Sequence, residues 1–263
     1  MSASLLTTKL FIPTQRPGMV ARSHLVEKLN LGRKKKLILV SAPAGYGKTT
    51  LLAEWISQQT ITACWVSLDS QDNDIRRFLS YITTSLRNAD IRINDNILSS
   101  TKDQESVIVS EYLSQLINQV ANSDRPIHLV LDDYHQIENR EIHQAVTYLV
   151  ENLPPTLHLV IASRSDPDLR LAKFRAQGEL CEIRVADLRF TVGEAVLYLN
   201  EHMGLGLSQS DISTLMEKTE GWIVGLQLAG ITLQQHPDKR HFVVSFAGDD
   251  RYIADYLFDE AFS

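Results

Sequence analysis

A short run of glycine, lysine and threonine residues between positions 42 and 50 has the types and spacing that bind nucleotide phosphates. Gly45 and Gly47 lack a Cβ, so the backbone there can curl until its N–H groups point at phosphate oxygens. Lys48 would place a positive charge beside the β and γ phosphates, and Thr49 would offer a hydroxyl ligand to Mg²⁺. The run departs from the usual pattern at Ala42, where a glycine is expected, but this is tolerable if φ is negative, and the following proline favours extended backbone. The predicted nucleotide contacts in this run are Ala44, Gly45, Tyr46, Gly47, Lys48, Thr49 and Thr50.

Two adjacent carboxylates follow a second apolar run at residues 127–131 and could complete such a site. We expect Asp132 to bind Mg²⁺ together with Thr49, either directly or through water. Asp133 is then the candidate that orients or deprotonates an attacking water. A pair of aspartates at the end of a strand can also be a plain helix cap, which is the alternative interpretation.

Two arginines are further candidates for contact with the nucleotide. Arg164 closes another apolar run, and if that run is a strand between the other two, its guanidinium would report whether the γ-phosphate is present. The alternative for Arg164 is a salt bridge to a neighbouring carboxylate. Arg22 precedes the first strand and would line the base or ribose, with a surface arginine as its alternative.

Five short apolar runs, with helical stretches between them, must position these residues. The runs lie near residues 37–40, 63–66, 127–131, 157–161 and 181–185, and such continuous runs are typical of strands buried on both faces. The spacing of an amphipathic helix occurs between them, at residues 109–120 and 142–150. This alternation predicts an α/β fold with a five-stranded, mostly parallel sheet covered on both sides. The glycine-rich run and the acidic pair resemble those of P-loop NTPases, and this resemblance implies the ASCE or AAA-like strand order 5-1-4-3-2.

The pattern changes after about residue 188, where helices are expected to follow one another without strands. Thr191 with Glu194 forms a capping box, Ser208 with Asp211 marks a second helix start, and residues 222–235 form a long amphipathic stretch. We therefore expect a helical lid subdomain after the α/β core. The predicted division is a nucleotide-binding core at 1–187, the lid at 188–240 and the start of a further domain at 241–263.

Composition narrows the class of protein. The chain has 263 residues, of which 44% are hydrophobic and 22% charged, as expected for a globular protein with a packed core. Its two cysteines lack the spacing of a zinc site or a disulfide framework, and no apolar run approaches the roughly 20 residues that cross a bilayer, so we expect a cytoplasmic protein without membrane contact. The net charge of −6 has the wrong sign for nonspecific binding to nucleic acid.

Several ordered motifs together resemble the MalT-like, LuxR-type ATP-dependent transcriptional activators of bacteria, which belong to the signal-transduction ATPases with numerous domains (STAND). The resemblance extends from Lys9 to Leu257, which is nearly the whole chain. The motifs are the run from Ser41 to Leu51, Trp65–Asp69 with Asp72–Asp74 and Arg77–Phe78, Leu129–His135, Ala162–Arg164, Asp187–Thr191 and Glu220–Trp222.

The resemblance implies a regulator that rests with ADP bound and self-associates when an inducer and ATP favour an open form. Slow, Mg²⁺-dependent ATP hydrolysis would reset it. The family continues with a winged-helix segment, a repeat sensor that receives the inducer and a C-terminal helix-turn-helix that binds DNA, so we expect this chain to be a truncated product or an excised nucleotide domain. By the same resemblance, Lys48 and Thr49 contact nucleotide and Mg²⁺, Asp132 and Asp133 form the acidic pair, and Arg164 is the sensor arginine. Gly221–Trp222 lies where related switches have a lid motif, without the proline of the eukaryotic relatives.

Two other functions remain alternatives. The chain could be a continuously active ATPase, such as an AAA-like remodeller, in which case a polymer such as DNA would stimulate a high turnover. It could also be a fragment that acts by pairing with a full-length homologue.

Overall fold

The computed structural model describes residues 5–14, 18–59, 61–93 and 105–246, and these form two compact units. We call them the sheet unit and the helical unit, and each is described by itself. The sheet unit comprises Met1–Thr14, His24–Ser41 and Thr49–Ile183, and the helical unit comprises Gln15–Ser23, Ala42–Lys48 and Arg184–Ser263.

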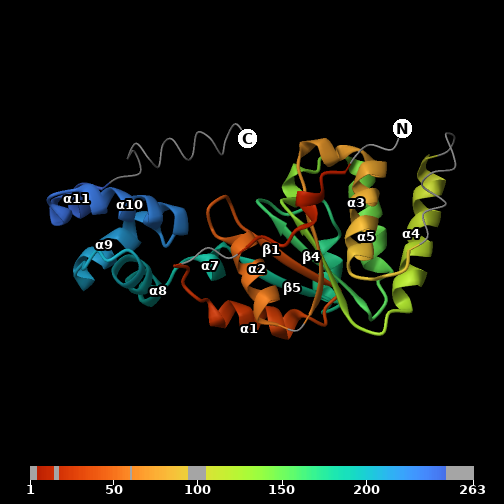
Figure 1. The fold of residues 1–263 in the computed structure, drawn as a ribbon, viewed down its shortest axis with the longest axis horizontal. Coiled ribbons are helices and arrows are strands. Elements are labelled where there is room, and N and C mark those ends of the chain that lie inside the picture. Colours follow the sequence, from red (N-terminus) through yellow and green to blue (C-terminus); the bar gives the residue numbers. More distant parts are fainter. Residues whose placement is uncertain (1–4, 15–17, 60, 94–104, 247–263) are drawn as a thin grey trace. The chain divides into compact units, whose positions relative to one another are not determined.

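The sheet unit is built on five strands in the order β2-β3-β4-β1-β5, which confirms the predicted order (Figure 1). The paired strands β2 and β3, β3 and β4, and β4 and β1 run parallel, so their carboxyl ends lie at one edge, where Ser67 is opposite Asp132 and Ser41 is opposite Ser163. The strands are β1 (Leu37–Ser41), β2 (Thr62–Ser67), β3 (Ile127–Asp132), β4 (Leu157–Ser163) and β5 (Leu180–Arg184).

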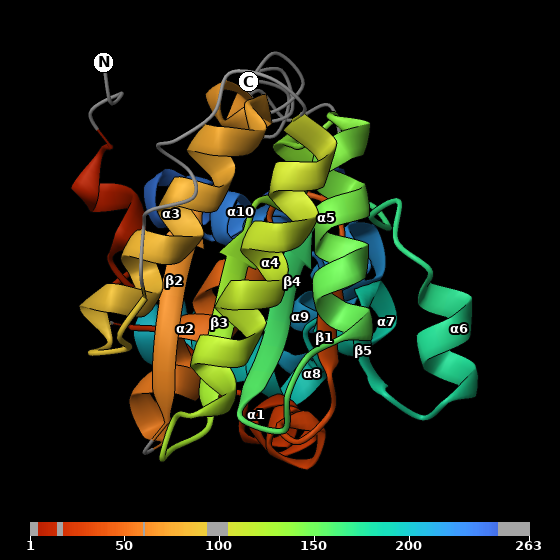
Figure 2. The ribbon, with the colours of Figure 1, turned by 90° about the vertical axis from the view of Figure 1, so that its right-hand side faces the viewer.

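Helices cover both faces of this sheet, which explains why β1, β3 and β4 are apolar at nearly every position. The prediction of burial on both faces is wrong for β5, because this strand lies at the edge of the sheet and only Ile183 in it is buried. All residues of β1, β3 and β4 are buried. One face packs against α3 (Ile75–Asn88), α4 (Glu105–Ala121) and α5 (Arg140–Glu151), which lie side by side in Figure 2, and the helical spacing at 109–120 and 142–150 is confirmed. The other face packs against α1 (Ser23–Gly32) and α2 (Lys48–Gln58); the Trp55 ring of α2 meets the His128 ring of β3 edge-on at 5.3 Å.

The sheet unit also has four short elements, and a buried charge cluster joins two of them, η1 and η2, to α3. Asp72 is fully buried, and its carboxylate accepts from Lys9 Nζ at 2.5 Å and from Arg77 Nε at 2.9 Å. Both of its oxygens therefore have a cationic partner, which is the condition under which a carboxylate can be buried. The short elements are η1 (Thr7–Leu10), η2 (Ser70–Asn73), η3 (Tyr134–Gln136) and α6 (Leu171–Ala176).

The helical unit contains the consecutive helices that the sequence predicts. The predicted capping box is present, because the Thr191 side chain accepts from the N–H of Glu194. The predicted helix start at Ser208 is also a capping box, in which the Ser208 side chain accepts from the N–H of Asp211. Leu199, Leu215, Leu226 and other apolar residues form a core of its own. Its elements are α7 (Val185–Leu188), α8 (Val192–Val196), the π-helical segment η4 (Leu197–His202), α9 (Gln209–Thr219), α10 (Ile223–Gln235) and α11 (Lys239–Ser245).

The boundary predicted near residue 188 lies close to Arg184, where the long segment of the helical unit begins, but the exact division remains a prediction. Of the further domain predicted at 241–263, residues 247–263 lie outside the described residues. Within the part of the chain that the structure describes, no helix has the length and apolar character needed to span a membrane.

Candidate functional site

The glycine-rich run forms a loop between β1 and α2. β1 ends at Ser41 and α2 begins at Lys48, so the loop is held at both ends by regular structure. Gly45 and Gly47 have φ of +78° and +74°, the left-handed region in which glycine carries no steric cost. Ala42 is not among the residues with positive φ, which confirms the expectation that alanine is tolerated at that position. Ala44, Gly45, Tyr46 and Gly47 are half-buried, and Thr50 is exposed on the first turn of α2.

The Lys48 side chain folds back onto the loop. Its Nζ donates to the carbonyl oxygens of Ala42 at 2.8 Å and Pro43 at 3.0 Å, and the residue is only 7% exposed. The loop therefore contains a desolvated positive charge held by its own backbone. Electrostatic attraction to an anion is strengthened in such a setting, because little water competes for the charge.

The first turn of α10 packs directly on this loop, within the helical unit. Trp222 Nε1 donates to the carbonyl oxygen of Ala44 at 3.0 Å. The backbone N–H of Val224 donates to the carbonyl oxygen of Gly45 at 3.3 Å. A Cβ at Gly45 would lie 2.6 Å from Trp222 Nε1 and 2.9 Å from the Val224 Cβ, so this approach also requires glycine. The sequence singled out Gly221–Trp222, but nothing in it indicated which backbone groups the tryptophan would meet.

The structure brings together Thr49 and Asp132, the two residues expected to bind metal, in the sheet unit. Thr49 Oγ1 lies 3.1 Å from Asp132 Oδ1 and 3.0 Å from Oδ2. Asp132 is the last residue of β3 and is 2% exposed. Two neighbouring oxygens of an octahedral Mg²⁺ with ligands at about 2.1 Å are separated by about 3 Å, so this oxygen pair suits such an ion.

Asp133 has a different setting from Asp132. Its backbone is left-handed, with φ of 55° and ψ of 38°, and its side chain is 46% exposed, with Oδ1 at 4.0 Å from His135 Nδ1. The carboxylate makes no capping hydrogen bond to η3, which argues against the helix-cap alternative. Unusual backbone conformations of this kind are typical of functional positions, because the surrounding structure must hold them.

Arg164 directly follows β4 and is half-buried. β4 does lie between β1 and β3, which is the arrangement on which its predicted role depended. Nearby in the sheet unit, Ser41 Oγ donates to Asp166 Oδ1 at 3.1 Å and ties the end of β1 to the segment after β4. The structure thus places Arg164 at the same edge of the sheet as Asp132.

Arg22 lies inside the helical unit, and the alternative of a surface arginine is wrong because the residue is only 5% exposed. Its Nε donates to Glu194 Oε1 at 3.0 Å, while Nη1 and Nη2 donate to the carbonyl oxygens of Leu188 at 2.7 Å and Arg189 at 2.9 Å. The guanidinium also lies 5.2 Å from the centre of the Phe190 ring. Arg22 therefore ties the α7–α8 connection together, and its role toward a nucleotide remains a prediction.

Glu194, the partner of Arg22, was not predicted to have a role beyond the capping box. Burial raises the pKa of its carboxyl, but hydrogen bonds from Arg22 and Thr191 and the charge of Arg22 lower it by more, so the pKa lies below its usual value. The carboxylate is thus kept charged inside the helical unit.

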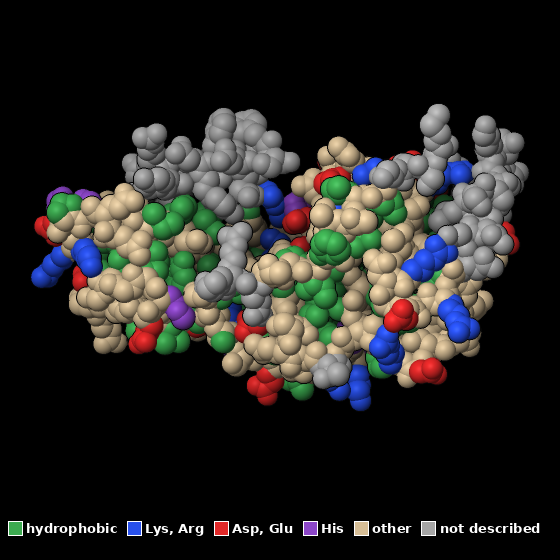
Figure 3. Space-filling model, viewed as in Figure 1, with side chains coloured by type: hydrophobic (Ala, Val, Ile, Leu, Met, Phe, Trp, Pro, Cys, Tyr) green, Lys and Arg blue, Asp and Glu red, His purple; other side chains and the backbone are tan. Residues whose placement is uncertain are grey.

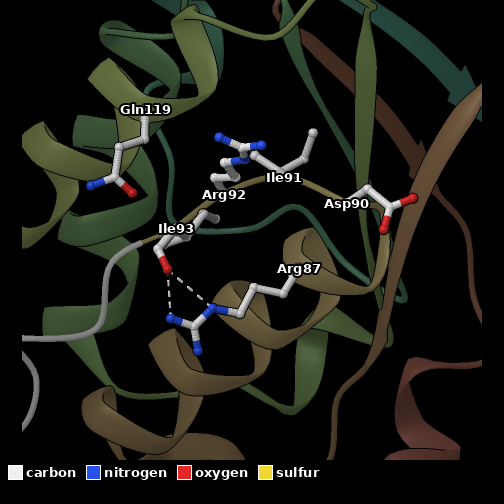
Figure 4. Close-up of a pocket in the computed structure, with 6 residues that line it drawn as sticks. All are labelled: Arg87, Asp90, Ile91, Arg92, Ile93 and Gln119. Atoms are coloured by element: carbon white, nitrogen blue, oxygen red, sulfur yellow. Dashed lines mark hydrogen bonds between the residues drawn. The ribbon is translucent and has the colours of Figure 1, made fainter.

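An open cavity elsewhere in the sheet unit has none of the predicted site residues in its lining. It has a volume of about 760 Å³ and lies between the end of α3 and α4 (Figure 4). The Arg87 guanidinium points across it and donates from Nε and Nη2 to the carbonyl oxygen of Ile93. This arginine therefore holds the chain after α3 in place.

The sheet order and the loop define the class of protein: the chain has the P-loop NTPase fold. A Walker-type ATPase of Pyrococcus abyssi shares this fold, with a TM-score of 0.55 and 15% identity over 97% of this chain and 79% of that one.

The resemblance to MalT is also confirmed. The chain is 33% identical over 258 residues to the HTH-type transcriptional regulators MalT of Yersinia pestis (strain Pestoides F) and Klebsiella pneumoniae subsp. pneumoniae. The match covers 97% of this chain and 28% of the length of these relatives. No family model matches the chain.

Proposed function

We propose that the chain is the nucleotide-binding switch module of a MalT-like transcriptional regulator, and that it binds ATP or ADP with Mg²⁺. The main support is the loop between β1 and α2, which combines two left-handed glycines with the desolvated ammonium of Lys48. A loop of this kind presents backbone N–H groups to phosphate oxygens, and the amino-terminal end of α2 adds a favourable dipole. The 33% identity to MalT regulators supports the assignment to transcription regulation.

Thr49 and Asp132 are the residues that would hold Mg²⁺, because their oxygens are adjacent and one of them is charged. Bound there, the ion would neutralise charge on the phosphates. Asp133 would accept a proton from the attacking water or orient it, and its half-exposed carboxylate is accessible for that purpose. Arg164 would sense the γ-phosphate from the end of β4.

Slow hydrolysis then acts as a timer in this proposal. The ATP form would favour self-association, an inducer would act through a sensor outside this chain, and DNA would be bound by a helix-turn-helix outside it. The chain spans 28% of the length of its MalT relatives, which leaves room for such parts in a regulator of that kind.

The central test is the affinity of Lys48→Ala for ATP, measured by calorimetry with Mg²⁺. We expect at least about a hundredfold loss, because the phosphates lose a charge-assisted contact in a desolvated loop. Lys35→Ala is the matched control, since Lys35 Nζ also donates to a backbone carbonyl, that of Gly178 at 2.6 Å, but outside the loop. Equal affinities for the wild type and Lys48→Ala would contradict the site assignment.

Mass spectrometry of nucleotide released from the denatured chain identifies the base and the number of phosphates. Retained ADP with very slow turnover supports the switch. A high turnover stimulated by DNA would instead support a continuously active ATPase. A chain that binds ATP without self-association but blocks a full-length homologue would indicate the pairing fragment.

A further inference from the structure

Two consecutive peptide groups of the loop are held by the first turn of α10. The Ala44 carbonyl accepts from the Trp222 indole N–H, and the Gly45 carbonyl accepts from the Val224 backbone N–H. Trp222 is the N-cap residue of α10 and makes no side-chain cap hydrogen bond to its own helix. Its polar atom is thus directed to the loop instead.

The planarity of the peptide bond gives these contacts a consequence on the other side of the loop. In a trans peptide, the C=O of one residue and the N–H of the next point in opposite directions. When the carbonyls of Ala44 and Gly45 face α10, the N–H groups of Gly45 and Tyr46 must face away from it. These are donors of the kind that a phosphate-binding loop presents to its anion.

Without such contacts the peptide groups of the loop could adopt more than one orientation. Gly45 has φ of +78°, and a glycine can adopt positive and negative φ with similar ease. The peptide planes on both sides of Gly45 could therefore rotate, and the N–H groups would face the anion for only part of the time. The affinity for phosphate falls in proportion to the fraction of loops in the competent orientation.

Trp222 is itself fixed in place within the helical unit. The Trp222 backbone N–H donates to the Thr219 carbonyl at 2.9 Å, and the Gly221 carbonyl accepts from the Phe190 N–H at 2.9 Å. Gly221 has φ of +72°, and a Cβ there would lie 2.8 Å from the Phe190 oxygen. Phe190 in turn packs against the buried Arg22 guanidinium. The tryptophan can therefore act as a fixed support for the loop.

We propose that Trp222 is a positioning residue for phosphate binding: its indole N–H fixes the Ala44–Gly45 peptide so that the loop N–H groups face the phosphates. This inference rests on the proposed function, because it concerns the same phosphate-binding loop. It assigns Trp222 to the polyphosphate and not to the base or ribose.

The test measures binding of Mg-ATP and of inorganic tripolyphosphate to the wild type and to Trp222→Phe. Tripolyphosphate has no base or ribose, so it reports on the phosphate contacts without those of the nucleoside. We expect both ligands to bind about five- to tenfold more weakly, as for the loss of one hydrogen bond that selects a loop orientation. Trp65→Phe is the matched control, because it also removes an indole N–H bond, from Nε1 to Ser67 Oγ at 2.9 Å, but in β2.

A second variant separates the hydrogen bond from the shape of the ring. In this variant only Trp222 is replaced, by the amino acid 3-benzothienylalanine. Its ring has nearly the same size as indole but has no N–H. We expect it to show the same weakening as Trp222→Phe, and this measurement decides the question if the phenylalanine variant does not fold.

The failures of the two proposals are distinguishable. A wild-type chain that binds neither ligand contradicts the proposed function. If the wild type binds both ligands and the position-222 variants bind them equally well, the function stands and the role of Trp222 is wrong. Weaker binding of ATP with unchanged binding of tripolyphosphate would also overturn the inference, because Trp222 would then act on the base or ribose.

Discussion

Asp132 and Asp133 are adjacent in the sequence, yet their surroundings suit them to different tasks. Asp132 is 2% exposed and faces the Thr49 hydroxyl, while the Asp133 side chain is 46% exposed. A buried carboxylate beside a hydroxyl suits a metal ion, whereas an exposed carboxylate can exchange a proton with water. Asp132 is the last residue of β3, whereas Asp133 lies just beyond the strand with a left-handed backbone.

Asp133→Asn tests the catalytic half of this pair. Asparagine tolerates left-handed backbone, so the turn should be kept. We expect ATP affinity within about twofold of the wild type, while single-turnover hydrolysis slows about a hundredfold or more, as for the loss of a general base. Asp132→Asn should instead weaken the Mg²⁺ dependence of nucleotide binding. An unchanged hydrolysis rate in Asp133→Asn would remove this residue from the proposed mechanism.

At the scale of elements, the predictions that succeeded rest on local patterns. The strands β1, β3 and β4 were predictable because strands buried on both faces need continuous apolar runs. The helix starts at Thr191 and Ser208 were predictable because each set of capping residues lies within four positions. The contact of Trp222 with Ala44 joins residues 178 apart in the chain, and that of Arg22 with Glu194 joins residues 172 apart. No local pattern encodes such pairs, because they depend on how the finished elements pack.

The Arg22–Glu194 pair predicts how the helical unit responds to pH. Because the pKa of Glu194 is lowered in the folded state, the pair stabilises the fold above the unfolded-state pKa, and this contribution is lost as pH falls through the folded pKa. We expect Glu194→Gln to destabilise the protein by about 3 kcal/mol at neutral pH, since Arg22 stays buried without its anion. The difference from the wild type should shrink as the pH falls below the ordinary pKa of a glutamate.

Urea unfolding at a series of pH values measures this difference. Glu220→Gln is the control, because Glu220 pairs with Arg189 at 2.6 Å but is 67% exposed, and exposed pairs contribute at most about 1 kcal/mol. The wild type and Glu194→Gln would then differ in their free energy of unfolding. If this difference stayed constant with pH, it would contradict the conclusion that the Glu194 carboxylate is charged in the folded protein.

For the whole molecule, charge bears on where DNA would bind in the proposed regulator. The net charge of the chain is −6, and positive and negative side chains are interspersed on the face shown in Figure 3. A surface that binds DNA nonspecifically has a field of one positive sign. The negative net charge of the chain agrees with the proposed assignment of DNA binding to another part of the regulator.

The switch proposal makes its last prediction for the association of whole chains. A nucleotide can shift an equilibrium between states only by binding one of them more tightly, so ATP and ADP must differ in their preference. Light scattering with saturating Mg-ATP should therefore give a higher mean mass than with Mg-ADP at the same protein concentration. Arg164→Ala should bind both nucleotides but lose this difference, because it lacks the guanidinium that is proposed to sense the γ-phosphate. Lys48→Ala should show no response to either nucleotide. A wild-type mass that is equal under both nucleotides, with binding of both demonstrated, would contradict association driven by the γ-phosphate within this chain.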